Sequence, residues 1–553
     1  MFNKKYKFFG ILLVVFLLAF FLRVYKLESI PYGFHVDEAK VGWNAYSILK
    51  TGMDDKGNKF PLYYDSFGDF RPAGLIYLTI PSVAVFGNTV FAVRFPFALI
   101  GALTTITIFL LVLEIFGGSK IYFALISAIL LAFNPWHIIA SRATSESIVV
   151  LFLTILGLYF FIKLLRSNSF TDMFGSFLTL VLAFFFYHNI RVLAPIFLLI
   201  LVFFYGLVFR KKIKIKQILV LMALILATFL IFLSPEARGR ASQVSLKSDF
   251  KVLYEVTKMP VEEGPGHVFV ARAFHNRMAA YIRRFAEEYK EYFSTSFLTG
   301  DSTKPVRYMV PQIGLITYFE LILIFLGIFF ASRKKEMLII LALLVIAPLP
   351  AAVTIEDTPN MQRAIFMIPF LLITAAYGFY ELTKLPSKWK YLSVLVGAGY
   401  FFNFIYFAHM YLVHQKMSIA TYYRNGGNVE LVEKLNEIGN DYEKIVLTNS
   451  PDSLYPWVAF LEKFDPLLFN RTYKNIDHGV RIFQKIVFSS DKCPLNEALK
   501  RGEKEFNSIL FVDAEGCEIE TKFKSSFEIN LVDTIKRPDN SPPYYLRTVT
   551  ILD

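Results

Sequence analysis

The sequence lacks the short motifs that mark several common enzyme classes. It contains no GxxxxGK[ST], no GxGxxG following a predicted strand, no GxSxG, no CxxC and no HExxH. ATPase, dinucleotide-dependent, serine-hydrolase and zinc-protease functions therefore have no support. Only two of the 553 residues are cysteines, and we find no internal repeat or low-complexity segment.

Apolar residues, in contrast, are in excess. They make up 55% of the chain, 59 residues are Phe and the mean hydropathy is +0.48, which is more than a soluble domain needs for its core. Eleven apolar runs suit a hydrocarbon layer of ~30 Å, the shorter ones with help from their flanks. We therefore expect a polytopic α-helical membrane protein with about 11 transmembrane helices. The runs are 8–25, 90–116, 121–133, 148–165, 173–187, 192–208, 218–233, 313–331, 337–353, 364–382 and 391–412.

The Lys and Arg residues behind the net charge of +13 form short clusters between these runs. If the basic N-terminus is cytoplasmic and is a retained first helix, alternate counting places nearly every cluster inside, as the positive-inside rule requires. Such clusters meet anionic lipid headgroups, and nucleic-acid binding is not expected. The inside clusters are 117–120, 163–169, 210–216, 332–336 and 384–390.

Two domains follow from this topology in a multi-pass protein of the cell membrane. Residues 1–413 form the transmembrane domain, with outer loops at 26–71 and 234–310, and the short apolar run 72–86 is an interfacial helix on the outer face. Residues 414–553 lose the hydrophobic density and predict a soluble extracytoplasmic α/β domain, with buried strands in KIVLTN and SILFVDA and an edge strand in YYLRTVTIL.

The two cysteines, Cys493 and Cys517, both fall in this outer tail. Disulfides persist outside the cytoplasm, so a bridge between them is plausible. Two buried free thiols are the alternative, because sequence does not supply the geometry.

Two adjacent acids, Asp37 and Glu38, follow the first apolar run in FHVDEAKVGWNAY. Apolar positions 41, 45, 48 and 49 predict an amphipathic helix that begins at these acids. An acid in the first turn is favoured by the helix dipole by about 0.3–1 kcal/mol. Glu38 can therefore simply stabilise the start of the helix, and substrate binding is the alternative role. The aromatic surroundings of Asp37 can raise its pKa and make it a usable base. These surroundings are Tyr32, Phe34, His35 and Trp43.

A second acid, Glu146, stands in NPWHIIASRATSES at the mouth of the run 148–165. A single ionisable group there can simply extend to water. Arg142 precedes Glu146 by four residues, so both lie on one face if the helix begins early. We take Glu146 as a candidate catalytic residue and Arg142 as a candidate substrate-binding residue, with a helix-stabilising pair as the alternative.

Four further polar residues are predicted at the outer ends of apolar runs. His188 and Arg191 lie in YHNIRVLAP, where a buried cation requires an anionic partner such as the phosphate of a lipid carrier. An Arg extending to water beside a satisfied His explains the same pattern. Arg71 and Arg363 precede apolar runs at the level where a lipid phosphate would lie.

The order of several segments resembles a known group of proteins. HVDEA, FRPAGLIYLTIPSVAVFG, VRFPFALIGALTTITIFLLVLEIFG and AFNPWHIIASRATSESIVVLF follow one N-terminal span. This pattern is similar to the protein O-mannosyltransferase and aminoarabinose transferase superfamily, over roughly residues 8–165. The resemblance implies a C-type glycosyltransferase fold and a polyprenyl-phosphate-linked sugar as the donor.

The resemblance also implies roles for individual residues. Asp37 matches the first-loop acid that deprotonates the acceptor hydroxyl, and Glu146 matches a second-loop acid that is often Asp in relatives. Arg71 matches a basic residue near the donor phosphate, and phosphate binding is a proposal for Arg191 and Arg363. A divalent metal near Asp37 and Glu146 is compatible with two carboxylates and a His, although no spacing requires one, and no other cofactor is certain.

The expected reaction transfers a sugar to a hydroxyl of a protein, lipid or glycan acceptor on the outer face, with inversion. Two other classes stay open. A transporter or lipid flippase also has many spans but should carry polar residues at mid-depth, and a non-catalytic membrane assembly protein would tolerate loss of Asp37.

Overall fold

The computed structural model describes residues 2–233, 249–301, 303–331, 334–472, 481–503, 505–523 and 526–552. The predicted outer loop 234–310 and the predicted inner cluster 332–336 each lie partly outside these residues. Contacts divide the chain into two compact units. The helical unit comprises Met1–Tyr25, Phe67–Pro72 and Phe97–Tyr411, and the loop–tail unit comprises Lys26–Ser66, Ala73–Pro96 and Leu412–Asp553. The predicted domain boundary at residue 413 stays a prediction.

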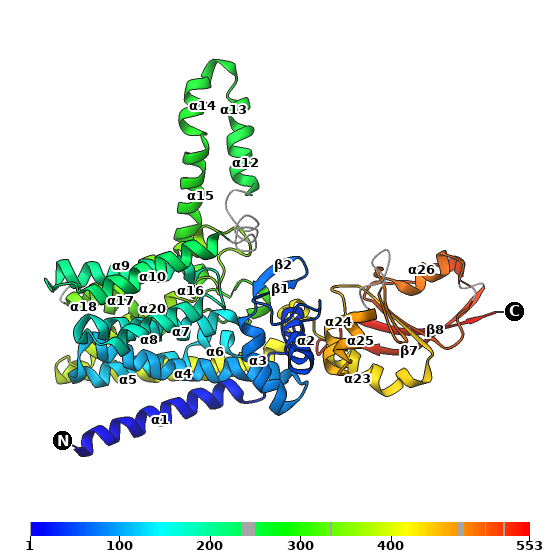
Figure 1. Cartoon of the computed structure of the whole chain (residues 1–553), viewed down its shortest axis with the longest axis horizontal. Coiled ribbons are helices and arrows are strands. Elements are labelled where there is room, and N and C mark those ends of the chain that lie inside the picture. The colour runs from blue at the N-terminus through cyan, green and yellow to red at the C-terminus, as the bar shows by residue number, and fades with distance from the viewer. Residues whose placement is uncertain are drawn as a thin grey trace. The chain divides into compact units, whose positions relative to one another are not determined.

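Apolar helices dominate the helical unit, and α17 with α20 and α7 with α8 form its most extensive helix pairs (Figure 1). The helices up to residue 232 are α1 (Phe2–Val24), α4 (Val90–Phe116), α5 (Ile121–Phe133), α6 (Pro135–Ser141), α7 (Glu146–Ser167), α8 (Phe170–Ala183), α9 (Ile190–Phe203), the π-helical turn η2 (Phe204–Val208) and α10 (Ile215–Phe232). Those that follow are α12 (Phe250–Thr257), α13 (Met259–Glu262), α14 (Val268–Phe274), α15 (Arg277–Glu291), α16 (Thr295–Leu298), α17 (Tyr318–Ala331), α18 (Lys335–Ile346), α19 (Leu349–Ala352), α20 (Met367–Leu382) and α21 (Ser387–His409).

The described helices support a multi-pass membrane protein but do not confirm eleven spans. Six are long and apolar enough to cross a membrane, or seven if the bent pair Gly118–Phe133 and Pro135–Ser141 is one span. Five further apolar helices are shorter, with 10–17 residues each. Two of them, Phe170–Ala183 and Tyr318–Ala331, overlap with predicted apolar runs. The bent pair turns by 56° because Asn134 caps a new helix whose first residue is Pro135.

The loop–tail unit joins an early segment of the chain to its end. Helix α2 (Val36–Thr51) packs against α3 (Gly74–Phe86) and against α24 (Tyr455–Leu461) of the tail. Strand β1 (Tyr63–Ser66) follows α2 in this unit, whereas the next strand, β2 (Asp69–Pro72), belongs to the helical unit. The segment 72–86, predicted as an interfacial helix, is therefore helical over α3.

A six-stranded mixed sheet forms the centre of the tail, which confirms the predicted α/β character. Strand β3 pairs in parallel with β5 and β6, and β8 pairs antiparallel with β6 and β7. The segment YYLRTVTIL was predicted as an edge strand, but it forms the interior strand β8, and β7 takes the edge. In spatial order the strands are β4 (Arg481–Phe483), β5 (Ile486–Phe488), β3 (Lys444–Leu447), β6 (Ile509–Ala514), β8 (Tyr544–Ile551) and β7 (Phe527–Ile535).

Helix α26 (Pro494–Lys500) covers this sheet with its apolar face (Figure 1). Leu495 and Leu499 pack with Phe506, Phe511 and Val549 in one buried cluster. The tail also contains the helices α22 (Ala420–Tyr423), α23 (Asn428–Ile438) and α25 (Pro466–Thr472). The predicted bridge is confirmed at the start of α26: the sulfurs of Cys493 and Cys517 are bonded, with Cα atoms 5.5 Å apart.

Candidate functional site

The two predicted acids lie in the first turn of α2, which begins where the sequence predicts. His35 is the N-cap, and its Nδ1 accepts the Asp37 N–H at 3.1 Å. Glu38 accepts the His35 N–H through Oε2 at 3.1 Å, so the two side chains form a capping box. The Asp37 carboxylate lies 3.5 Å from His35 Nδ1 and its side chain is 23% exposed. The capping interpretation of Glu38 is therefore confirmed.

Glu38 also forms the centre of a buried charge cluster. Its carboxylate accepts from Arg94 Nε at 3.1 Å and Nη2 at 2.9 Å, and from Arg424 Nη2 at 2.9 Å. All three side chains are buried. Arg94 also donates to the carbonyls of Leu27 and Pro31, so the cluster fixes the segment that precedes α2. Sequence reasoning missed both arginines, because neither lies near Glu38 in the chain.

The tail holds the same segment through further hydrogen bonds. The Val36 N–H donates to Asn425 Oδ1 at 3.1 Å, and Trp457 Nε1 donates to the Phe34 carbonyl at 2.7 Å. Gly33 has φ +89°, and a Cβ there would lie 2.7 Å from the Arg424 carbonyl oxygen. Only glycine suits that combination of backbone and close approach. The start of α2 is thus held by residues 389 and 423 positions further along the chain.

The aromatic residues predicted around Asp37 differ in exposure. Phe34 and Trp43 are fully buried, and the Trp43 ring packs edge-on against Phe469 with centroids 5.2 Å apart. Tyr32 is partly buried, and burial, with the nearby Glu430 carboxylate, raises the pKa of its hydroxyl well above the usual value. Tyr32 therefore stays protonated at neutral pH and can act as a hydrogen-bond donor.

A second buried cluster lies on the next turn of α2. Lys40 pairs with Asp55 and also donates to the Tyr455 hydroxyl. That hydroxyl donates in turn to Asp55 Oδ2 at 3.1 Å. Asn44 Oδ1 accepts the Asp55 N–H at 3.0 Å. The sequence contains one sign of this cluster, because Lys40 has apolar neighbours on a predicted helix. The burial of its side chain was not predicted.

In the helical unit, Arg142 and Glu146 do not lie on one face of a common helix, as the sequence allowed them to. Arg142 ends α6 as its C-cap, whereas Glu146 is the first residue of α7, so the helix does not begin early enough to carry both. Arg142 is buried and donates to the carbonyls of Leu22 and Tyr25 at 2.7 Å each, at the end of α1. Its guanidinium also lies over the Tyr411 ring, 5.5 Å from the centroid.

The start of α7 is joined to two other predicted outer segments. Gln362 Nε2 donates to Ser145 Oγ at 3.3 Å and to the Tyr308 hydroxyl at 2.6 Å. Ser145 immediately precedes Glu146 and is the N-cap of α7. Ser145, Tyr308 and Gln362, from three separate parts of the chain, therefore meet beside Glu146, which is partly exposed. Sequence reasoning missed Gln362 and Tyr308, because neutral polar residues in loops carry no pattern.

Arg363 and Arg71 each have an acidic neighbour close in sequence. Arg363 pairs with Glu356 and donates to Thr354 Oγ1 at 2.8 Å. Arg71 Nε donates to Asp69 Oδ2 at 2.8 Å, and the Arg71 side chain is 28% exposed. Both guanidinium groups are thereby oriented before any ligand binds.

Arg191 and His188 interact directly, as the sequence allowed. Arg191 Nη1 lies 2.7 Å from His188 Nδ1, and Nη2 donates to the Phe184 carbonyl at 2.8 Å. Because a guanidinium only donates, His188 Nδ1 acts as the acceptor and the ring is neutral with its proton on Nε2. Arg191 is buried at the start of α9.

The predicted site residues are distributed over both units. Asp37 and Glu38 belong to the loop–tail unit, and the other six belong to the helical unit. Within the described residues, no group of three or more His, Cys, Asp or Glu side chains is arranged to hold a metal ion. The catalytic, phosphate-binding and metal-binding roles therefore stay predictions.

Comparisons with known proteins agree with this architecture. Residues 71–233, less than a third of the chain, match the model of the dolichyl-phosphate-mannose-protein mannosyltransferase family. No curated protein sequence matches the chain.

Solved structures match over most of the chain. ArnT from Cupriavidus metallidurans bound to undecaprenyl phosphate is 11% identical, with 98% of each chain covered and a TM-score of 0.52. The apo oligosaccharyltransferase of Archaeoglobus fulgidus is 15% identical, with 93% of this chain and 70% of that chain covered and a TM-score of 0.51. The same enzyme tethered with an acceptor peptide gives 14% identity and a TM-score of 0.49, with 83% of this chain matched to 63% of that one. This chain thus spans less than two thirds of that structure.

The chain has the fold of the C-type membrane glycosyltransferases, as its ordered motifs predicted. It is a multi-pass membrane protein with a C-terminal β-sheet domain.

Proposed function

We propose that the protein is a membrane glycosyltransferase that moves a sugar from a polyprenyl-phosphate donor to a hydroxyl acceptor on the outer face of the membrane. The fold and the family match support the transferase class. The proposed orientation has a cytoplasmic N-terminus and an extracytoplasmic tail, which follows from the positive-inside rule.

The observation that carries the proposal is the unequal environment of two adjacent acids. Glu38 is buried and engaged by two arginines, whereas the neighbouring Asp37 side chain is 23% exposed. A general base must reach a substrate proton, which excludes Glu38 in this arrangement and favours Asp37. The capping box and the arginine cluster fix the backbone that carries Asp37, and preorganisation of this kind supports catalysis.

In the proposed step, Asp37 accepts the proton of the acceptor hydroxyl as its oxygen attacks the anomeric carbon. The bond from that carbon to the phosphate oxygen breaks, and polyprenyl phosphate leaves with the bonding electrons. Attack opposite the leaving group inverts the anomeric centre. Cationic side chains stabilise the charge that develops on the phosphate, and we assign this role to Arg71 and Arg363 because their guanidinium groups are already oriented.

Supporting roles for the remaining residues follow from the same scheme. We propose that Glu146 binds a sugar or acceptor hydroxyl at the start of α7, where Gln362 and Tyr308 supply additional polar groups. We propose Arg142, His188 and Arg191 as further substrate-binding residues, which the protein groups they contact hold in place.

The test replaces Asp37 by Asn and measures transfer from a panel of polyprenyl-phosphate sugars in membranes. A base contributes about 10²–10⁴-fold, so we expect a loss of that size without loss of expression. Asp441→Asn is the matched control, because Asp441 is an exposed acid of the same unit. Full transfer by Asp37→Asn would refute the base assignment. Absence of transfer by the wild type with every donor would refute the transferase itself and favour a transporter or an assembly protein.

A further inference from the structure

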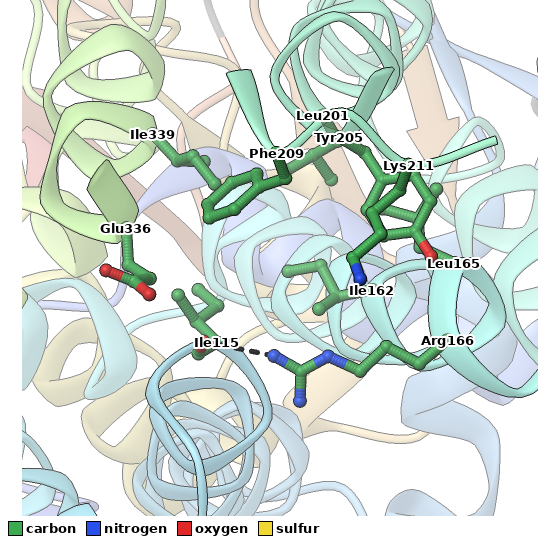
Figure 2. A pocket seen from close by; sticks show the side chains of 10 residues that line it. All are labelled: Ile115, Ile162, Leu165, Arg166, Leu201, Tyr205, Phe209, Lys211, Glu336 and Ile339. Carbon is green, nitrogen blue, oxygen red and sulfur yellow. Dashed lines mark hydrogen bonds between the residues drawn. The ribbon is translucent and has the colours of Figure 1, made fainter. Parts of the chain in front are cut away.

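A cavity of about 420 Å³ opens at the end of the helical unit that lies away from Glu146. It is formed where α4, α7 and η2 end and where α18 begins (Figure 2). Twenty residues of α7 separate Glu146 from Arg166, or about 30 Å at 1.5 Å per residue. The cavity is therefore distinct from the proposed active site. Its lining residues are Ile115, Ile162, Leu165, Arg166, Leu201, Tyr205, Phe209, Lys211, Glu336 and Ile339.

The lining combines apolar walls with a charged rim. Figure 2 shows Arg166 and Lys211 on one side and Glu336 on the other, with Phe209 and the aliphatic side chains between them. The Arg166 side chain is half-exposed, and it is held by Glu114 Oε1 at 3.1 Å and by the Ile115 carbonyl at 3.2 Å. This guanidinium is thus fixed at the rim with donors still open to solvent.

The segments that line the cavity carry an excess of exposed positive charge. Lys335 Nζ lies 3.5 Å from the Val208 carbonyl, which joins the start of α18 to the end of η2. The structure therefore brings together three of the basic clusters that the sequence placed on one face. Among the described residues of these clusters, the exposed cations are Arg166, Arg210, Lys211, Lys212, Lys214, Lys334 and Lys335.

We propose that this cavity binds one anionic phospholipid of the adjacent leaflet. Its phosphate would lie between Arg166 and Lys211, because paired cations suit a phosphate. The first part of an acyl chain would cover the Ile, Leu and Phe side chains, which a free phosphate would leave in contact with water. The volume falls in the range of roughly 300–1,000 Å³ that is usual for small-molecule sites.

Glu336 narrows the choice of headgroup. A carboxylate at the rim favours a ligand that can donate to it, and the hydroxyls of a phosphatidylglycerol headgroup supply donors without adding a positive charge. A phosphatidylcholine headgroup has no donor at all. Charge complementarity with the surrounding cations favours the anionic lipid. We therefore assign phosphatidylglycerol as the occupant.

The test counts bound lipid by native mass spectrometry of the full chain, released from nanodiscs with equal phosphatidylglycerol, phosphatidylethanolamine and phosphatidylcholine. We expect one retained phosphatidylglycerol. Each basic residue near an anionic headgroup contributes about a factor of five, so Lys211→Gln should weaken retention about fivefold and Arg166→Gln with Lys211→Gln about thirtyfold. The control, Lys214→Gln with Lys334→Gln, removes two exposed cations that do not line the cavity.

Three results would overturn the assignment. Equal losses in the control and in the lining variant would show that the rim attracts lipid only through its general charge. Preferential retention of phosphatidylethanolamine or phosphatidylcholine would refute the anionic headgroup. Complete displacement by millimolar inorganic phosphate would show a phosphate site without a lipid chain. None of these results depends on transferase activity, so the proposed function is tested separately.

Discussion

Buried ionisable groups on α2 of the loop–tail unit have charged partners, whereas Glu320 and Arg23, buried on apolar helices of the helical unit, have neutral ones. In the loop–tail unit, Glu38 pairs with arginines and Lys40 pairs with Asp55. In the helical unit, the fully buried Glu320 accepts from Asn134, from the Thr317 N–H and from Tyr400, which are all neutral groups.

Arg23 in α1, like Glu320, has hydrogen-bond partners that are not acids. It donates to the carbonyls of Ala19, Leu131 and Ala132 and approaches His137 Nδ1 at 2.8 Å. A helix in a membrane offers many carbonyls and few acids, whereas a water-exposed unit can bring opposite charges together during folding. The difference predicts that loss of one charge is more costly in the loop–tail unit.

The largest effect is expected for Glu38→Ala, which leaves Arg94 and Arg424 buried without their carboxylate. Breaking a buried ion pair costs about 3–5 kcal/mol, and loss of the helix cap adds to it. We expect a corresponding fall in the free energy of unfolding, measured from the fluorescence of the purified protein in detergent. Glu443→Ala, an exposed acid of the same unit, is the control, and an equal effect of both variants would contradict the prediction.

An intermediate effect is expected for Glu462, a partly buried acid of the tail for which the described residues provide no ion pair. Burial raises the pKa of its carboxyl to about 7, and the Lys485 charge acts in the opposite direction. The unfolded chain loses this proton near pH 4.5, so the folded state binds more protons between pH 4.5 and 7. Stability therefore falls as pH rises through that window and stays lower above it.

Glu462→Gln removes the loss of stability that deprotonation of this carboxyl causes. Because the side chain is partly exposed, we expect a gain of only about 1–2 kcal/mol at pH 8 and no gain at pH 4. Thermal unfolding of the variant and the wild type across that range measures the difference. Glu505→Gln, an exposed acid of the tail, should leave the profile unchanged. A gain of equal size at both pH values would contradict the assignment.

The smallest effect is expected for Arg23→Met. The carbonyls of Leu131 and Ala132, in the last turn of α5, lose a donor, because Pro135 has no N–H and the Trp136 N–H donates to Leu315. The cost of burying the charge is removed at the same time, and replacing a buried charge by an apolar side chain of similar length is often neutral. We expect a change in the free energy of unfolding below about 1.5 kcal/mol. A loss as large as that of Glu38→Ala would show that the two units do not differ in this respect.

Sequence reasoning identified the features that are encoded locally. Runs of apolar residues predicted the helical membrane protein, alternating and buried segments predicted the tail sheet, and the position of Cys493 and Cys517 predicted their bridge. The start of α2 at the acid pair was also predictable, because a helix N-terminus has a short signature.

The remaining features depend on contacts between distant segments. Glu38 meets Arg94 across 56 positions and Arg424 across 386, and no local pattern encodes such a partner. The break between Arg142 and Glu146 depends on the packing of α6 and α7. Hydropathy predicted about eleven spans, but helices such as α8 and α17 are shorter than a full crossing.

The clamp on α2 has a consequence for the order of assembly. The segment with Asp37 emerges early in synthesis and meets Arg94 soon after, but Arg424, Asn425 and Trp457 are made only after the last apolar helix. The unit that carries the proposed base thus cannot reach its final packing until nearly the whole chain has been synthesised. A protein truncated anywhere before the tail would insert helices into the membrane without a formed α2 clamp, so completion of synthesis would itself control when the site becomes competent.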